Sequence, residues 1–488
     1  MSQITPHSSE LKKEVGSFGV LSLGVGAMVG FGWVILVGDW IMKAGSFGAI
    51  LAFLIGGLMM GVVALVYAEL VAAMPHAGGE HNYIMRALGP RWSLFGSWAI
   101  TGGYSAVIAF ESVALPRALG YIVPLDKGYM YTVDNFEVYA LWVAAGSVTA
   151  ILITIINVLG VKFATNVQIF VVVFLFAVGA LQLCGVFIGG DMTKLEPFFG
   201  DRETGGLAGF VSVLVVVPFM FVGFDVIPQT AEEANLPSRK IGMLSFNSVV
   251  VAAIWYMLII FGVSVALDAS ELANSELPAA DGFAALFGGS KFIANLIVAA
   301  GLAGILTSWN SLQMGAARLL YSLARGGMLP RWLAYVHPKF GTPMNAVILL
   351  GLFATVAPFF GRSTLVWVVD ASSPMVVIAY MMVAISFVVL RYREPDMERP
   401  LWIGGRGLGG KLIGYLAIAI TIFLITCYIP GIPWAADLSW QSWVIFGLWW
   451  LFGLYFTMRV PGGIKPGPLS ETQVLQVIEE RHMRKKAR

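Results

Sequence analysis

The sequence at residues 24–33 is Gly24–Val25–Gly26–Ala27–Met28–Val29–Gly30–Phe31–Gly32–Trp33, so glycine recurs through an apolar segment. A second apolar segment contains Phe219–Met220–Phe221–Val222–Gly223–Phe224–Asp225, with Pro228 shortly after it. Glycine and proline weaken helices, so both segments are predicted to unwind midway. Unwound backbone inside a bilayer is tolerated only where protein or a water-filled cavity satisfies its polar groups. Two interrupted segments in corresponding halves of a chain therefore indicate a solute-binding site.

The composition places the chain in a membrane. Its 488 residues are 58% hydrophobic and only 12% charged, with a mean hydropathy of +0.82. Soluble domains carry roughly 25% charged residues, so a soluble enzyme is excluded. Cys184 and Cys427 lie in apolar runs and indicate neither a disulfide framework nor a metal cluster. No histidine lies in an apolar run, and the sequence has no HExxH metal motif or hydrolase serine elbow, so we expect no enzyme. We also expect no cofactor and no nucleic-acid partner.

Apolar runs long enough to cross a bilayer recur along the whole sequence. A crossing helix needs about 20 mostly apolar residues. The sequence predicts an all-α polytopic protein with twelve transmembrane helices, at residues 18–42, 46–74, 93–123, 137–160, 165–189, 210–234, 243–268, 292–324, 343–361, 364–390, 412–430 and 440–459. The run at 343–361 is short, and the run at 364–390 contains Asp370 and Pro374.

The basic residues predict the orientation of these helices. Lysine and arginine concentrate in cytoplasmic loops of membrane proteins. With the N-terminus inside, the external loops hold only Lys43, Lys127, Lys194, Arg202, Lys291 and Arg362. We therefore expect a protein of the cell membrane whose segments 1–17 and 461–488 are both cytoplasmic. Residues 470–488 are either a solvated tail or an amphipathic helix that contacts anionic lipids. The sequence leaves the oligomeric state open.

Several short motifs follow one another in a fixed order along the chain. They are Tyr67–Ala68–Glu69–Leu70 with Pro75–His76–Ala77–Gly78–Gly79–Glu80, Gly223–Phe224–Asp225 with Ala231–Glu232–Glu233, Ala324–Arg325–Gly326–Gly327–Met328–Leu329–Pro330, Gly341–Thr342–Pro343, and Arg391–Tyr392–Arg393 with Arg399–Pro400. Each motif is weak alone, but the ordered set resembles the amino acid–polyamine–organocation permease family over residues 15–460.

The resemblance implies a LeuT-type fold with a 5+5 inverted repeat. Helices 1–5 would form the first transmembrane repeat, at residues 18–190. Helices 6–10 would form the second repeat, at residues 210–391. Helices 11 and 12 would follow at residues 411–460.

The two broken segments predict how a substrate is held. A helix that restarts after a break has free N–H groups and a partial positive charge, which suit a carboxylate. We assign Gly30, Phe31 and Gly32 to this side, and Gly223 to the second break, whose carbonyls suit an ammonium group. Glycines can instead serve only close helix packing. Family members often have a small hydroxyl residue where this chain has Phe31, so their substrate preference does not transfer directly.

Three further side chains are candidate substrate contacts. Phe219 precedes the second break, where the family often has a gating aromatic residue; ordinary packing is the alternative. A carboxylate at membrane depth is costly and indicates function, so Asp225 is predicted to accept the substrate amine or to carry a proton. Capping of a half-helix is the alternative for Asp225. Glu111 is a second such acid, which contacts the substrate or serves a structural role.

The sequence leaves open whether the coupling ion is sodium or a proton. Thr307 and Ser308 form a hydroxyl pair in an apolar run, and with the carbonyls of Gly26 and Val29 they make a candidate sodium site, because hard cations prefer oxygen ligands. The alternative is that these hydroxyls bond back to their own helix. Several family members carry a lysine that faces this region, whereas residues 168–175 contain none.

The resemblance and the residues together predict secondary active transport by alternating access. The substrate would be an amino acid or a related small amine-bearing solute, and the coupling cation sodium or a proton. A polyamine or monoamine carrier, or an exchanger, is the alternative within transport. A transporter-like nutrient sensor or a channel is the alternative from a different class.

Overall fold

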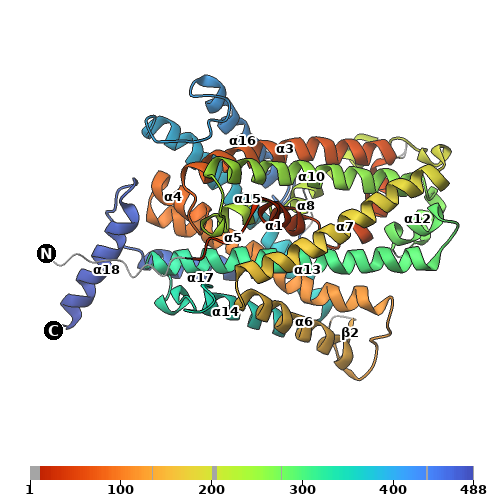
Figure 1. Cartoon of the computed structure of the whole chain (residues 1–488), viewed down its shortest axis with the longest axis horizontal. Helices are drawn as coiled ribbons and strands as arrows, with labels where there is room; N and C mark the ends of the chain where they lie inside the picture. The colour runs from red at the N-terminus through yellow and green to blue at the C-terminus, as the bar shows by residue number, and fades with distance from the viewer. Residues whose placement is uncertain are drawn as a thin grey trace.

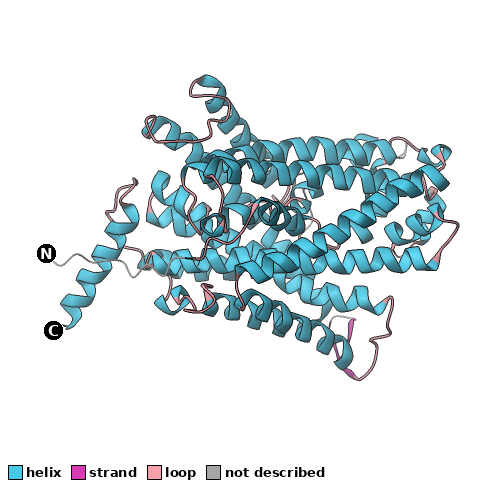
Figure 2. Ribbon diagram, viewed as in Figure 1, coloured by secondary structure: helices cyan, strands magenta, loops and turns pink. Residues whose placement is uncertain are grey.

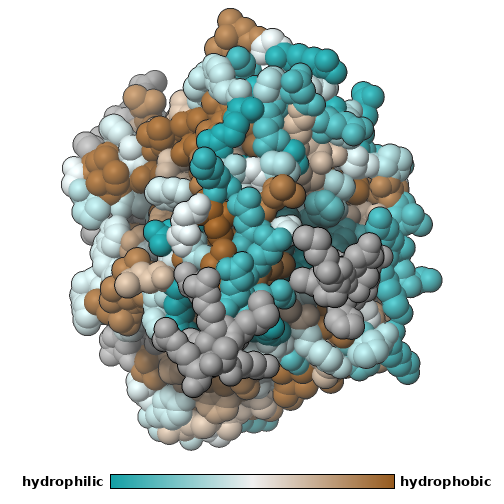
Figure 3. All heavy atoms as spheres, turned by 90° about the vertical axis from the view of Figure 1, so that its left-hand side faces the viewer, coloured by the Kyte–Doolittle hydropathy of each residue, from teal (hydrophilic) through white to brown (hydrophobic). Residues whose placement is uncertain are grey.

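The computed structural model describes residues 11–133, 136–200, 206–275, 277–432, 434–435 and 438–486. Helices dominate, and most of them run along the long axis of the molecule (Figure 1). Helices α4 (Glu80–Leu88) and α18 (Ser470–Lys486) lie at one end of this axis, and α12 (Pro278–Leu286) lies at the other. Seen from the α18 end, the surface carries many hydrophilic residues (Figure 3).

Eight of the described helices are long and apolar enough to cross a membrane, and a bent pair of helices adds a ninth candidate span. The eight helices are α3 (Ser46–Ala73), α5 (Pro90–Gly120), α6 (Ala140–Val158), α7 (Val161–Gly189), α10 (Ser238–Ser264), α13 (Lys291–Arg325), α15 (Gly361–Arg393) and α16 (Leu408–Thr426). The bent pair is α1 (Ser17–Met28) with α2 (Gly32–Ala44). The chain is therefore a helical, multi-pass membrane protein.

The remaining elements are shorter or less apolar. They are α8 (Gly206–Met220), α9 (Val226–Gln229), α11 (Ala269–Asn274), α14 (Met344–Val356) and α17 (Trp440–Arg459), with 3-10 turns at Met192–Leu195, Ala231–Glu233, Arg331–Ala334 and Ala357–Phe360.

The outer faces of the long helices remain apolar where they are exposed. Leu58 is 64% exposed on α3, and Phe170 and Phe187 on α7 are 76% and 89% exposed. Such large apolar surfaces are rare on soluble monomers. These faces are therefore the ones that hydrocarbon chains would cover.

Each of the twelve predicted runs contains helix, and the two that the sequence supports least have different outcomes. The run at 364–390 lies within the continuous helix α15, even though Pro374 lies inside it. The run at 343–361 gives only the 13-residue α14 and a 3-10 turn. Proline cannot donate a helical hydrogen bond, and Pro358 lies in this turn, where the regular helix ends.

The expectation of an all-α chain is wrong for one short segment. Strands β1 (Tyr129–Val133) and β2 (Phe136–Tyr139) pair antiparallel and lie at the end of the molecule far from α18 (Figure 2). β-branched and aromatic residues favour strands, and Tyr129, Tyr131 and Val133 supply them. The predicted helix at 137–160 therefore begins later than expected, because residues 137–139 belong to β2 and α6 begins at Ala140.

The two broken segments lie at the centre of the helix bundle. Helix α1 packs against α7, α10 and α13, and α5 packs against α13 and α15. Helix α9, which follows the second break, also packs against α1 and α13. Backbone at these breaks is therefore surrounded by protein rather than by lipid.

The C-terminal segment forms helix α18 rather than a free solvated tail. Ser470 and Val474 are buried, and α18 packs against α4 and α5. Glu471 on α18 lies 4.0 Å from the guanidinium of Arg325 at the end of α13. The described part of the tail therefore covers part of the face that carries α4.

Candidate functional site

The first break separates α1 from α2. The two helices are bent by 52° with respect to each other. The regular bonding ends with the N–H of Val29, which donates to Val25 O at 2.9 Å. The N–H groups of Gly30, Phe31 and Gly32 bond to no other residue that the structure describes. The start of α2 therefore presents unsatisfied donors, as helix N-termini do.

The second break touches the first. Helix α8 ends at Met220, and turn residues 221–225 lead into α9. Gly223 has φ of +124°, a conformation that favours glycine. A Cβ atom there would lie 2.5 Å from Ala27 Cβ, near the end of α1. Only glycine therefore allows the two breaks to approach this closely.

A single side chain from α10 joins both breaks. The Tyr256 hydroxyl lies 2.7 Å from Met28 O and 3.3 Å from Met220 O. These carbonyls belong to the last residues of α1 and α8, where helical partners are missing. Tyr256 is not among the residues predicted from the sequence, where its only signal is a hydroxyl within an apolar run.

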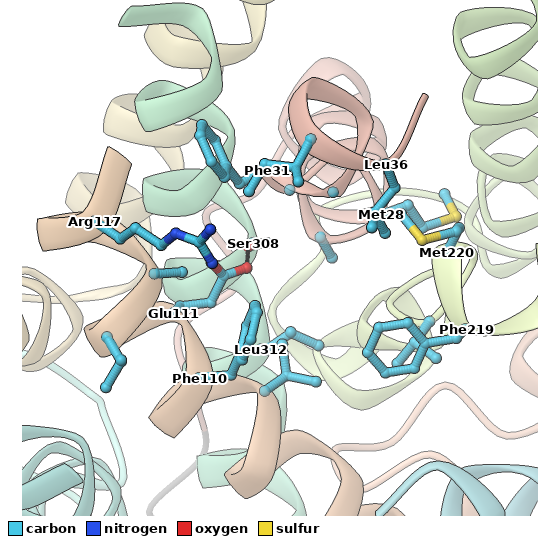
Figure 4. Close-up of a pocket in the computed structure, with 18 of the residues that line it drawn as sticks. Met28, Phe31, Leu36, Phe110, Glu111, Arg117, Phe219, Met220, Ser308 and Leu312 are labelled. Carbon is cyan, nitrogen blue, oxygen red and sulfur yellow. Dashed lines mark hydrogen bonds between the residues drawn. The ribbon is translucent and has the colours of Figure 1, made fainter. Parts of the chain in front are cut away.

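A cavity of about 240 Å³ opens beside the breaks. In Figure 4, Phe31 and Leu36 lie on one side, and Phe219 and Met220 lie across from Arg117. Most lining side chains are apolar, and Glu111 and Arg117 of α5 are the charged ones. Ligand pockets of this kind hold an apolar group and fix it with few polar atoms.

Glu111 stands where the cavity meets the first break. Its side chain is buried and accepts a hydrogen bond from the Ser308 hydroxyl of α13. Its second oxygen, Oε2, has no partner among the described residues. A Cβ added to Gly30 would lie 3.2 Å from Glu111 Oε1, so this carboxyl group lies directly beside the unwound backbone.

The predicted substrate residues separate into two groups. Gly30, Phe31, Gly32, Phe219 and Glu111 all line the cavity. Gly223 does not, although its neighbour does, and neither does Asp225.

Asp225 instead folds back onto its own turn. Its Oδ1 accepts from the Gly223 N–H at 3.0 Å and from the Tyr380 hydroxyl at 3.3 Å. Asp225 is the residue that precedes α9, but its side chain makes no capping hydrogen bond to that helix. A contact with a solute in the cavity is not part of this geometry either.

The bulky residues of the first break point in different directions. The ring of Phe31 lies against Gly301 of α13, where a Cβ would come within 2.5 Å of it. Trp33 is fully buried and packs edge-on against Trp255, with ring centroids 5.6 Å apart. Phe31 therefore shapes the cavity, whereas Trp33 does not line it.

The candidate sodium residues are near one another, but an amide lies among them. Gln168 Nε2 of α7 lies 3.2 Å from both Ser22 O and Thr307 O. A Cβ on Gly26 would lie 2.0 Å from this nitrogen. The Thr307 hydroxyl donates to Gly304 O of its own helix at 2.9 Å.

The remaining two sodium candidates are also engaged by neighbours. Ser308 bonds to Glu111 as described, and also lies 3.2 Å from Ile305 O. The carbonyl of Val29 faces α13 at Gly304, where a Cβ would come within 2.9 Å of its oxygen. Both hydroxyls thus contact a carbonyl of their own helix, and Ser308 also bonds to α5.

Buried ion pairs close the end of the bundle near α4. Arg318 of α13 pairs with Glu233 at 2.8 Å, and both side chains are fully buried. The N–H groups of Glu14 and Val15 donate to the Glu233 carbonyl, which fixes the segment before α1. Arg318 therefore does not extend to the surface, because its partner lies in the core.

Comparison with known proteins gives one consistent answer. A family model described as amino acid permease matches residues 15–454. The branched-chain amino acid permease BcaP of Bacillus subtilis is 25% identical over 92% of this chain and 93% of its own length. The methylthioribose transporter of the same organism is 25% identical over 90% of this chain and 93% of its own length. Vacuolar cationic amino acid transporter 4 of Arabidopsis thaliana is 26% identical over 80% of this chain and 65% of its own length.

Proposed function

Because this chain belongs to the amino acid permease family, we propose that it carries an amino acid or a related small amine-bearing solute by alternating access. It is a transporter of that family and not an enzyme. We infer the LeuT-type arrangement with twelve spans, in which residues 18–190 and 210–391 are inverted repeats and 411–460 add two helices. The protein would lie in the cell membrane with residues 1–17 and 461–488 in the cytoplasm.

The observation that carries this proposal is the buried carboxyl group of Glu111, which has one free oxygen and lies beside the unbonded N–H groups of the first break. The N–H groups at Gly30, Phe31 and Gly32 suit a carboxylate. Glu111 Oε2, buried and without a partner, suits an ammonium group. The two kinds of group lie next to each other, as the two ends of an α-amino acid do.

The rest of the cavity favours an apolar substrate side chain. Phe31, Phe219 and Met220 contribute apolar surface, as do Phe110 and Leu312. At about 240 Å³ the cavity is smaller than the roughly 300–1,000 Å³ of typical ligand pockets, so it suits a small solute. A branched or aromatic amino acid fits these features better than a polyamine, because Glu111 is the only acidic side chain among the described residues of the lining.

The contacts around the candidate cation site favour proton coupling over sodium coupling. The Gln168 amide donates to carbonyls of α1 and α13 in the space next to Gly26. A sodium ion would need those oxygens and that space. We therefore expect uptake to continue when sodium is replaced by choline and to fail with a protonophore.

A transport assay in proteoliposomes tests the function. We expect saturable uptake and counterflow of an apolar amino acid, which a channel or a nutrient sensor would not give. Amines without a carboxylate should compete poorly. Equal competition by such amines would favour the polyamine or monoamine alternative, and absence of counterflow for every amino acid and amine tested would refute the carrier.

A further inference from the structure

A second buried polar cluster lies apart from the cavity and has no role in the substrate site described above. Its centre is a pair of carboxyl groups, Glu80 at the start of α4 and Asp225 in the second break. Both side chains are fully buried, and neither lines the cavity.

Each carboxyl group is only half satisfied. The Gln229 amide donates to Glu80 Oε2, while Asp225 Oδ1 accepts from the Gly223 N–H and from Tyr380. Glu80 Oε1 and Asp225 Oδ2 have no hydrogen-bond partner among the described residues. A buried acceptor without a partner costs about 1–3 kcal/mol, and more if it is charged. An added hydrogen on these oxygens would lower that cost.

The groups around the pair are hydroxyls and not cations. The titratable groups that face the two acids are Tyr67 of α3, Tyr83 of α4, Tyr104 of α5 and Tyr380 of α15. The Tyr67 hydroxyl lies next to the carboxyl group of Glu80, and the Tyr104 hydroxyl lies next to that of Asp225. A ring of hydroxyl groups can pass a proton, because each is both a donor and an acceptor.

No counter-ion balances the two acids. Within the described chain, neither carboxyl group lies within salt-bridge distance of a basic side chain. The nearby arginines have other partners, since Arg318 pairs with Glu233 and Arg391 with Glu69. Burial, and then the charge of Asp225, raise the pKa of Glu80 well above its usual range. Two unpaired carboxylates at one buried site cannot both stay ionised.

We propose that Glu80 and Asp225 share one proton and form the proton-carrying site of the transport cycle, separate from the substrate cavity. The proton leaves Asp225 Oδ2, and Glu80 Oε1 takes it up through the tyrosine hydroxyls between them, each of which gives up one proton as it accepts another, so one acid is ionised at each stage. Release to the cytoplasm follows from Glu80, which lies on α4 outside the spans. The proposal rests on the transport function proposed above.

The second break connects this site to the substrate. Asp225 holds the N–H of Gly223, and Gly223 lies against Ala27 at the end of α1. A change in the charge of Asp225 alters that hydrogen bond, because a charged acceptor binds an N–H more strongly than a neutral one. The proton site and the substrate cavity therefore both contact the same pair of breaks.

The test compares gradient-driven uptake with counterflow in proteoliposomes. In Glu80→Gln we expect accumulation driven by an inward proton gradient to fall to the level without a gradient, while counterflow at equal pH continues. Glu80→Asp keeps a carboxyl group and should keep accumulation. Glu398→Gln, which removes an exposed carboxyl group in the loop after α15, is the matched control and should behave as wild type.

Three results would overturn the proposal. The first is that Glu80→Gln accumulates substrate to the same level as the wild-type protein. The second is that uptake by the wild-type protein responds to a sodium gradient but not to a proton gradient. If Glu80→Gln does not fold, proton entry measured with a pH dye during wild-type uptake decides, and its absence refutes the site. Counterflow that persists in these cases leaves the carrier function intact, so the two proposals fail separately.

Discussion

At the scale of single residues, the two acids in the apolar segments have different surroundings. Asp225 follows a glycine break and was expected to meet the substrate amine, whereas its side chain bonds within its own turn. Glu111 lies in an unbroken helix, its residue lines the cavity, and one of its carboxyl oxygens has no partner among the described residues. Sequence position identified both as unusual, but only the packing of α5 against α13 shows which one faces the cavity.

Replacing Glu111 by glutamine should weaken substrate binding. The change removes the charge and keeps the shape, so the loss is one charge-assisted hydrogen bond of about 1.5–3 kcal/mol. That corresponds to an apparent Kd about 10- to 100-fold higher. Binding measured by the ligand-induced shift in melting temperature would show this. Asp39→Asn, at an exposed acid on α2, is the control; equal effects of both changes would contradict the assignment.

At the scale of elements, the two breaks depend on each other. Gly223 needs its positive φ and its contact with Ala27, and Tyr256 donates its hydroxyl to both broken ends. A helix break inside a bilayer is stable only when its polar groups find partners. The neighbouring break and α10 supply some of these partners here.

Replacing Gly223 by alanine should destabilise the protein and weaken binding. The added methyl group meets Ala27 and must also adopt φ of +124°, a strain of about 1–3 kcal/mol. Gly288→Ala shares a positive φ, +69°, but has open space around it. A thermal melt of both variants separates strain from contact: similar losses in both would mean that contact between the breaks does not matter.

Replacing Tyr256 by phenylalanine tests the link between the breaks. The change removes one hydroxyl and leaves buried carbonyls at Met28 and Met220 without that donor, which costs about 1–3 kcal/mol. We expect a lower melting temperature and weaker substrate binding. Normal binding affinity at reduced stability would instead mean that the hydroxyl supports the fold without shaping the site.

At the scale of the whole molecule, one end of the bundle is closed by buried charge. Arg318, Glu233 and the backbone of Glu14 and Val15 connect α13, the segment after α9 and the segment before α1. The cavity is lined on its other side by Phe136 of β2 and Trp142 of α6, near the opposite end. In the orientation proposed above, the closed end would face the cytoplasm.

Replacing Arg318 alone should lower the free energy of unfolding far more than replacing both Arg318 and Glu233. Arg318→Met leaves Glu233 buried and unpaired, a loss of about 3–5 kcal/mol, whereas the double change to methionine removes both charges and is often close to neutral. Thermal unfolding in detergent would show a large drop for the single variant only. Equal melting temperatures for the single and double variants would contradict the role of this pair.

The sequence by itself determined the membrane class, the positions of the helices, the two breaks and the family. These follow from apolar periodicity, from glycine and proline, and from motifs in order, all of which are local along the chain. Gly30, Phe31, Gly32 and Phe219, which line the cavity, were also predicted this way, because they are adjacent to the breaks.

The tertiary structure decided which side chains meet at those breaks. Tyr256, Gln168, Glu80 and Glu111 come from four different helices, and no local pattern relates their positions. A helix orients each side chain by its rotation within the bundle, which depends on packing against distant segments. For that reason the sequence located the unwound backbone, whereas only the folded molecule shows which groups satisfy it.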